Sequence, residues 1–161
     1  MKKIVFATAL FLLAAGCSRQ PIAENPPQNN SSFISYFSGS FANISGVKLN
    51  LAVARTSEQQ SQGLSNRDPI TDDQGMLFLM ASASRHTFWM KDMKFPIDII
   101  WINGDTVADI SKDCPAPKIP EEKLPTFQPQ TAVDKVLEVP AGWSVRHKLK
   151  IGDKIELNIL P

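Results

Sequence analysis

The stretch IDIIWINGDTVADIS, residues 97–111, decides the fold class. Its first six residues form an apolar run of strand length, interrupted only by Asp98. Asn103-Gly104 follows, a pair typical of two-residue hairpin turns because both residues tolerate a positive φ. The segment TVADIS then returns as a second strand. An antiparallel hairpin is therefore predicted at 97–111.

The segment before residue 64 predicts a strand followed by a short helix. In VKLNLAVA, residues 47–54, apolar and polar residues alternate with the period of a half-buried strand. Thr56 and Gln59 have the spacing of a capping box, in which each side chain bonds the backbone N–H of the other residue. Gly63 is suited to end the helix that this box begins.

The other elements are predicted from apolar runs and from proline. Apolar runs at 75–80 and 86–90 are separated by a short polar segment, so we expect a hairpin between them. Five prolines within 113–130 exclude a helix or a central strand there. The last predicted elements are a strand at 132–139, a short helix from 140 to about 149 and a strand at 154–160. The fold class is mainly β (α+β): a small barrel or sandwich of about seven short strands with two short capping helices.

Length and composition limit the class of protein. The chain has 161 residues, with 17 Lys and Arg against 16 Asp and Glu and a formal net charge of +1. This length predicts one domain, and this charge argues against a nucleic-acid partner held by bulk electrostatics. Two cysteines cannot form a disulfide framework, so the fold must depend on its apolar core.

The N-terminus has the pattern of an export signal. Residues 1–17 read MKKIVFATALFLLAAGC, with two lysines before an apolar run that is too short to span a bilayer. The ending AAGC resembles the lipobox of bacterial lipoproteins and predicts cleavage before Cys17, which would then be acylated; an unmodified secreted protein is the alternative. Because Ser18 rather than Asp follows, the resemblance implies the outer membrane.

These features divide the chain into three parts. Residues 1–16 are predicted to be a lipoprotein signal peptide, 17–43 a lipid-anchored flexible tether, and 44–161 a single globular β-rich domain. Within the tether, 18–32 is rich in Pro, Asn, Gln and Ser and is expected to be disordered. The protein is expected in the cell envelope, on the periplasmic side of the outer membrane, with the membrane as partner through its acyl anchor.

Several long runs carry a resemblance to a known family. They are VARTSEQQSQGLSNRD (53–68), GMLFLM (75–80), RHTFWMKDMKFPIDIIWI (85–102) and VLEVPAGWSVRHKLKIGDKI (136–155). The chain resembles the domain of unknown function 192 family over about 47–160. Members of that family are often exported or lipid-anchored, but the resemblance implies no reaction. Asp92 stands where the family commonly has Asn, which argues against a role that needs an amide there.

A polar and aromatic group suggests a ligand site. Trp89 next to charged residues is how a shallow site binds a glycan or a peptide, by stacking and by charge-assisted hydrogen bonds. The equal alternative is a buried Trp89 and a structural ion pair between Arg67 and Asp98. The predicted ligand-binding residues are Arg67, His86, Trp89, Lys91 and Asp98.

Asp98 in particular needs a partner. It lies among isoleucines, where an unpaired carboxylate would cost several kcal/mol. Arg67 is preferred over Lys91 and Arg85 because a planar guanidinium can hold a carboxylate with two hydrogen bonds. On this interpretation Arg67→Ala would destabilise the fold by about 3–5 kcal/mol.

The sequence therefore favours a non-enzymatic binding or accessory module of the cell envelope for a glycan or peptide, with no cofactor. No catalytic signature or resident metal site is predicted. One alternative is a copper-handling protein, although core packing explains its methionines better; its donors would be Met76, Met80, His86, Met90, Met93 and Cys114. A second alternative is a hydrolase in which Cys114 acts with His86 or His147. Trp143 is expected to fill the core.

Overall fold

The computed structural model describes residues 37, 39–118 and 124–161. The predicted signal peptide, Cys17 and the segment 18–32 lie outside the described residues. Neither helix of the described part is long and apolar enough to cross a membrane.

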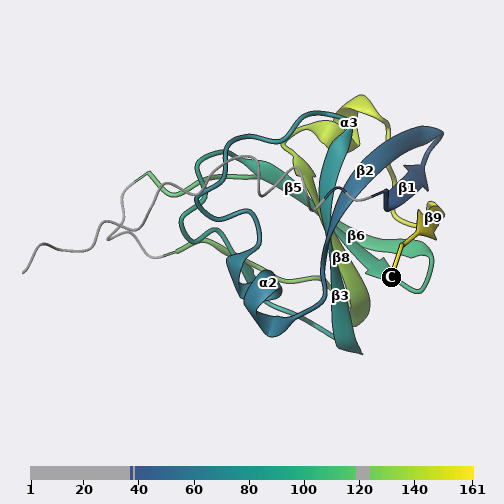
Figure 1. Cartoon of the computed structure of the whole chain (residues 1–161), viewed down its shortest axis with the longest axis horizontal. Coiled ribbons are helices and arrows are strands. Elements are labelled where there is room, and N and C mark those ends of the chain that lie inside the picture. Colours follow the sequence, from purple (N-terminus) through teal and green to yellow (C-terminus); the bar gives the residue numbers. More distant parts are fainter. Residues whose placement is uncertain (1–36, 38, 119–123) are drawn as a thin grey trace, which may run out of the picture.

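Seven of the described strands form one large sheet, in the order β6-β5-β8-β3-β2-β1-β9 (Figure 1). Neighbouring strands are antiparallel except β2 and β3, which are parallel. A second sheet has two strands of two residues each, β4 (Phe88–Trp89) and β7 (Thr126–Phe127). The strands of the large sheet are β1 (Phe41–Ile44), β2 (Val47–Ala54), β3 (Gln74–Ser84), β5 (Ile97–Asn103), β6 (Thr106–Cys114), β8 (Val133–Pro140) and β9 (Ile155–Asn158).

The large sheet curls into a half-barrel because its two end strands meet at one end. Thr106 at the start of β6 forms an antiparallel bridge with Lys154, just before β9. Val107 N–H donates to the Asp153 carbonyl at 2.9 Å, and Ile155 N–H donates to the Asp105 carbonyl at 2.8 Å. The predicted mainly β, barrel-like class is confirmed.

The curl encloses one of two apolar clusters. Alternate residues of each strand point inward, and the helix α3 (Trp143–Arg146) adds Trp143, which is fully buried as expected. We call this set the inner cluster: Ala42, Ile44, Leu49, Leu51, Leu77, Ile100, Ile102, Val107, Leu137, Val139, Trp143, Leu149 and Ile155.

The opposite face of the sheet carries a second cluster, beside α2 (Ser57–Gln62) and the small sheet. β5 is buried on both faces, which explains why its residues are apolar apart from Asp98 and the terminal Asn103. We call this set the outer cluster: Ala52, Ala54, Leu64, Ile70, Met76, Phe78, Met90, Met93, Phe95, Ile97, Ile99, Trp101, Cys114, Val133 and Val136.

Two local predictions are confirmed. The capping box of α2 is present: Gln59 N–H donates to Thr56 Oγ1 at 3.3 Å, and Thr56 N–H donates to Gln59 Oε1 at 3.1 Å. The predicted hairpin of β5 and β6 is also present, but its turn residues are Gly104, with a φ of 61°, and Asp105, because Asn103 pairs with Thr106 as the last residue of β5. Both signals act between residues close in sequence, so they do not depend on the rest of the fold.

The predicted hairpin between 75–80 and 86–90 is wrong. β3 continues to Ser84, and both of its edges are occupied, by β2 on one side and β8 on the other. The segment 86–90 therefore has no free edge of β3 to pair with, and β4 pairs with β7 instead. β7 lies in the proline-rich segment, but it is only two residues long and outside the large sheet.

The strand predicted at 47–54 is confirmed as β2, but an unpredicted strand precedes it. β1 starts at Phe41 and pairs with both β2 and β9, so the predicted boundary between residues 43 and 44 falls within β1. Before it, Phe37 packs against the outer cluster. Phe37 and residues 39–41, from the C-terminal part of the aromatic-rich stretch FISYFSGSF (33–41), thus belong to the folded domain.

Candidate functional site

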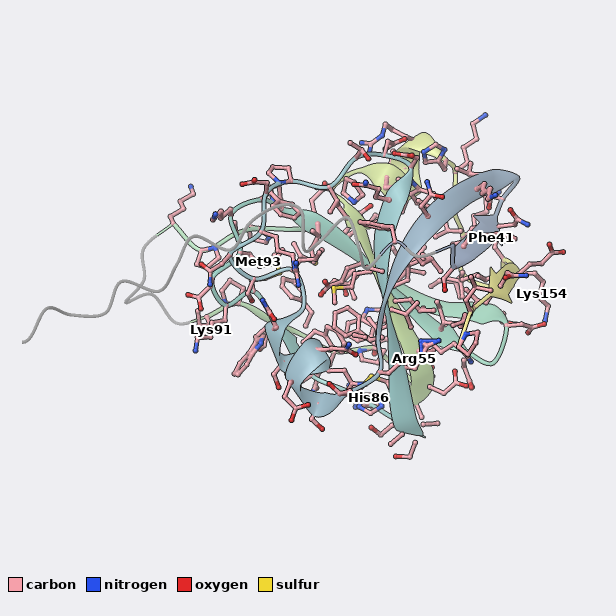
Figure 2. All side chains as sticks on the ribbon, viewed as in Figure 1. Phe41, Arg55, His86, Lys91, Met93 and Lys154 are labelled. Carbon is pink, nitrogen blue, oxygen red and sulfur yellow. The ribbon has the colours of Figure 1, made fainter. Side chains whose placement is uncertain are left out.

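A pocket of about 250 Å³ opens on the outer-cluster side of the sheet. It lies between α2, β3, β4 and β8, and Figure 2 shows Met93 on the same side of the molecule as α2. Its polar lining comes mainly from α2 and its apolar lining from the strands. The lining residues are Ser57, Gln60, Ser61, Gln62, Gly63, Leu64, Ser65, Phe78, Met80, Thr87, Phe88, Trp89, Met93 and Glu138.

The α2 wall is fastened to the sheet by a few polar contacts. Gln60 Nε2 donates to the Leu79 carbonyl of β3 at 2.7 Å. Gly63, with a φ of 49°, passes so close to Phe78 that a Cβ there would lie 3.4 Å from Phe78 Cζ. Arg67 Nε donates to the Gly63 carbonyl at 3.0 Å and so braces the same turn. Arg67 thus supports the pocket wall but does not line the pocket.

Aromatic rings form the opposite wall. Phe88 packs edge-to-face against Phe78, with ring centroids 5.0 Å apart, and against Trp101 at 5.5 Å. Trp89 remains 52% exposed at the rim. Lys91 Nζ lies 5.9 Å from the centroid of the Trp89 ring, within the range of a cation–π contact. The structure therefore brings Trp89 and Lys91 together, and Trp89 is not the buried residue of the alternative interpretation.

Glu138 is the one ionisable side chain among the described residues that line the pocket. It is 5% exposed, and its Oε2 has no hydrogen-bond partner within the described part of the chain. Burial raises the pKa of this carboxyl group to about 8. In β8 it lies between Met76 of β3 and Ile99 of β5, two residues of the outer cluster.

Sequence reasoning missed Glu138, although the signal was present. It stands in the apolar strand VLEVP as Asp98 stands in IDIIWI, and the same argument about unpaired buried carboxylates applies to both. Only the topology shows that Glu138 faces a pocket, because side chains alternate between the two faces of the sheet.

The predicted pairing of Asp98 with Arg67 is wrong. Asp98 is fully buried and lies opposite Val139, on the inner-cluster face, whereas Arg67 lies beside the pocket on the outer-cluster face. Asp98 Oδ1 accepts from the N–H groups of Asp113 at 2.9 Å and Gly142 at 3.0 Å. Asp98 Oδ2 accepts from Ser144 N–H at 2.9 Å and from Ser144 Oγ at 2.6 Å.

These bonds make Asp98 the cap of α3. The first N–H groups of a helix have no partner within the helix, and the N-cap residue of α3 is Gly142, which has no side chain to supply one. A carboxylate there also interacts favourably with the positive end of the helix dipole. The role of Asp98 is therefore structural. Its hydrogen-bond donors come from Asp113, Gly142 and Ser144, and neither Arg67 nor a pocket residue is among them.

His86 and His147 lie in other surroundings. His86 Nε2 lies 2.9 Å from the Ser82 carbonyl and its ring nitrogens 3.1 Å from Ser84 Oγ; the side chain does not line the pocket. His147 Nε2 lies 2.8 Å from Asp72 Oδ2 on the α3 side of the molecule. Neither histidine is the partner of the Cys114 thiol, which donates to the Ser111 carbonyl at 3.5 Å.

The structure gives little support to the two alternatives, a Cys114-dependent hydrolase and a copper-handling protein. Burial, followed by the charges of Asp98 and Glu138, raises the pKa of Cys114 to about 12, so this thiol is protonated at neutral pH. The methionines of the suggested copper site are mainly packed in the core: Met76, Met90 and Met93 are at most 8% exposed. Among the described residues no three His, Cys, Asp or Glu side chains group as metal ligands.

Asp92 has a backbone reason for its residue type. Its φ is 55°, in the left-handed region, which Asn and Asp adopt more readily than other residues with a side chain. Its carbonyl accepts from Asn66 N–H at 2.8 Å, which ties the loop after Met90 to the loop after α2. The turn thus accounts for an Asn or Asp here without a ligand.

Comparison with solved structures agrees with this fold. A protein of unknown function from Novosphingobium aromaticivorans DSM 12444 is 31% identical, with a TM-score of 0.63 over 73% of this chain and 82% of that one. A proposed transcription regulator from Sinorhizobium meliloti 1021 is 25% identical, with a TM-score of 0.64 over 73% of this chain and 91% of that one. No curated protein matches the chain significantly.

The family comparison covers the whole curled sheet. The family model described as "Uncharacterized ACR" matches residues 41–157, from the first residue of β1 to the penultimate residue of β9. This span includes the pocket, Glu138 and the Asp98 cap. The chain therefore belongs to the domain of unknown function 192 family.

Proposed function

We propose that this protein is a binding module of the cell envelope and that its pocket receives a side chain of a peptide. The observation that supports this most directly is the pocket itself, which joins an exposed Trp89 at the rim to a buried, unpaired Glu138 at the floor. A concave site that combines an apolar wall with placed polar groups is typical of a ligand pocket.

The lining favours a peptide over a glycan. A buried sugar presents hydroxyl groups on every side, and each hydroxyl left without a partner costs free energy. The wall formed by Phe78, Met80 and Phe88 offers such hydroxyls no hydrogen bond. An apolar side chain would pack against this wall with no such cost, and the volume of about 250 Å³ suits one side chain.

The proposal is tested with an array of short peptides in which one central position carries each of the twenty amino acids in turn. Binding of the purified full-length protein is measured, followed by Kd in solution. We expect Trp89→Ala to weaken binding of the selected peptides at least tenfold, because the rim loses its stacking surface. Ile151→Ala is the matched control, since Ile151 is an exposed apolar residue, 64% exposed, that does not line the pocket.

Two results would contradict this proposal. One is peptide binding that is the same in Trp89→Ala as in the unchanged protein. The other is selective binding to glycans on a parallel glycan array, with no peptide retained.

The envelope location is proposed from the N-terminal sequence, which lies outside the described residues. The signal of 1–16 and the lipobox-like ending before Cys17 support an acylated mature N-terminus on the periplasmic side of the outer membrane. We expect the protein to fractionate with outer membranes and Cys17→Ala to release it or leave it unprocessed. An unacylated N-terminus found by mass spectrometry would refute the anchor.

A further inference from the structure

Glu138 has a feature that the fold does not require. A buried side-chain oxygen usually has a hydrogen-bond partner, yet Glu138 Oε2 has none in the described structure, while the other buried acid, Asp98, accepts four hydrogen bonds. Glu138 also lines a pocket, whereas Asp98 does not. Glu138 therefore keeps hydrogen-bonding capacity beside the pocket that no described residue uses.

We propose that the pocket takes a primary ammonium group on an apolar stem, as in a lysine side chain, and that this ammonium pairs with Glu138. The inference rests on the proposed function of the pocket as a peptide site. It names the class of side chain that the pocket selects.

The shape of the lining favours this class. Phe78, Met80 and Phe88 form an apolar wall beside which the methylene groups of a lysine stem can pack. Trp89 at the rim adds an aromatic surface that attracts a cation on its way in.

The described surroundings of Glu138 contain no positively charged group that pairs with it. Its strand neighbours Met76 and Ile99 are apolar, and the residues of α2 that line the pocket are serines and glutamines. Cys114 is the titratable group close enough for Glu138 to affect its pKa, and the protonated thiol carries no charge. Lys91 lies at the exposed rim over Trp89. No described residue of the lining is a cation that could pair with Glu138, so the pairing partner we propose is a cation on the ligand.

Pairing changes the protonation of the site. The raised pKa of Glu138 means that most of the carboxyl group is protonated at pH 7 in the empty pocket. An ammonium group has a pKa near 10 and enters charged. On pairing, the Glu138 O–H bond breaks, the proton passes to buffer, and the carboxylate and ammonium remain paired. Binding should therefore release up to one proton at pH 7 and should tighten as the pH rises toward 8.

The experiment compares three probes on the full-length protein at pH 7. They are the N-acetyl methylamides of lysine, of norleucine, which has the stem without the ammonium, and of Nε-acetyllysine, which keeps an N–H donor without the charge. Affinity is measured from the indole N–H signal of Trp89 by NMR. Proton release is measured by calorimetry in two buffers with different ionisation enthalpies.

We expect the lysine probe to bind at least tenfold more tightly than either neutral probe and to release a proton. Glu138→Gln should remove this preference and the proton release, so that the lysine and norleucine probes bind the variant with similar affinity. Glu156→Gln, a change of an exposed acid on β9, is the matched control and should alter neither.

The outcomes separate this inference from the proposed function. Equal binding of the lysine and norleucine probes at Trp89 would overturn the ammonium pairing and still support a peptide pocket. Tighter binding of the Nε-acetyllysine probe would show that a protonated Glu138 recognises a neutral group, which also overturns the pairing. If none of the probes and none of the arrayed peptides binds, both proposals fail.

Discussion

At the scale of single residues, Glu138 makes the stability of the empty protein depend on pH. Its pKa rises from an ordinary value of 4.5 to about 8 on folding, so between these values the folded state holds a proton that the unfolded state has released. The stability due to this group is fully present below pH 4.5 and is lost as the pH rises through 8. The slope is at most about 1.4 kcal/mol per pH unit, the value for one proton.

Glu138→Gln should remove this dependence, because the amide does not titrate. In urea denaturation at pH 5, 6.5 and 8, the free energy of unfolding of the variant should increase relative to that of the unchanged protein as the pH rises. A difference between the two proteins that stays constant from pH 5 to 8 would show that Glu138 titrates normally.

Asp98 should be far more sensitive to substitution than an exposed acid. In Asp98→Asn an NH₂ group must face either Ser144 or the N–H groups of Asp113 and Gly142, so donors would meet donors. We expect a loss of about 2–4 kcal/mol in the free energy of unfolding, measured with urea, since bonds to a buried charge are strong. Asp105→Asn is the control: this acid pairs with Lys154 on the exposed surface, and its change should affect stability far less than Asp98→Asn. Equal effects would refute the cap.

Asp98 also shows what the sequence can reveal about one residue. Its place among isoleucines correctly predicted burial and the need for partners. The partners are mainly backbone N–H groups 15 to 46 residues away along the chain. Such donors carry no sequence signature, and a search among cationic side chains therefore chose Arg67.

At the scale of elements, the sequence predicts local structures, which form between neighbouring residues, better than it predicts pairings between distant strands. The capping box, the hairpin of β5 with β6 and the strand β8 are predicted correctly from their own residues. The hairpin of 75–80 with 86–90 is not, because the parallel pairing of β2 with β3 occupies the required edge. The pocket depends on this pairing, so its lining could not be assembled from the sequence.

The short helix α2 should depend strongly on its cap. It has six residues and none of them is buried, so packing contributes little to its stability. Thr56→Ala should reduce the free energy of unfolding by about 1 kcal/mol, and it should weaken ligand binding because α2 forms one wall of the pocket. Thr56→Ser keeps a capping hydroxyl and should be close to the unchanged protein in urea denaturation and in Kd. A loss as large in Thr56→Ser as in Thr56→Ala would show that the hydroxyl is not what matters.

At the scale of the whole molecule, Trp143 and Trp89 should contribute very differently to the free energy of unfolding. Trp143 is fully buried in the inner cluster and its Nε1–H donates to the Asp72 carbonyl at 2.9 Å. Trp143→Ala should reduce the free energy of unfolding by about 3–5 kcal/mol in urea denaturation. Trp89→Ala should reduce it by less than about 1 kcal/mol, because 52% of Trp89 is exposed. A reversed order would place the folding core on the pocket side of the sheet.

The position of β1 between β2 and β9 also determines when the domain can be completed. A ribosome makes β1 among the first residues of the domain and β9 among the last. Until the final residues emerge, one edge of β1 has no partner and the curled sheet cannot close where β9 approaches β6. The domain can therefore finish folding only once β9 is available. During the interval the nascent chain presents an open strand edge, the kind of surface that chaperones and proteases recognise.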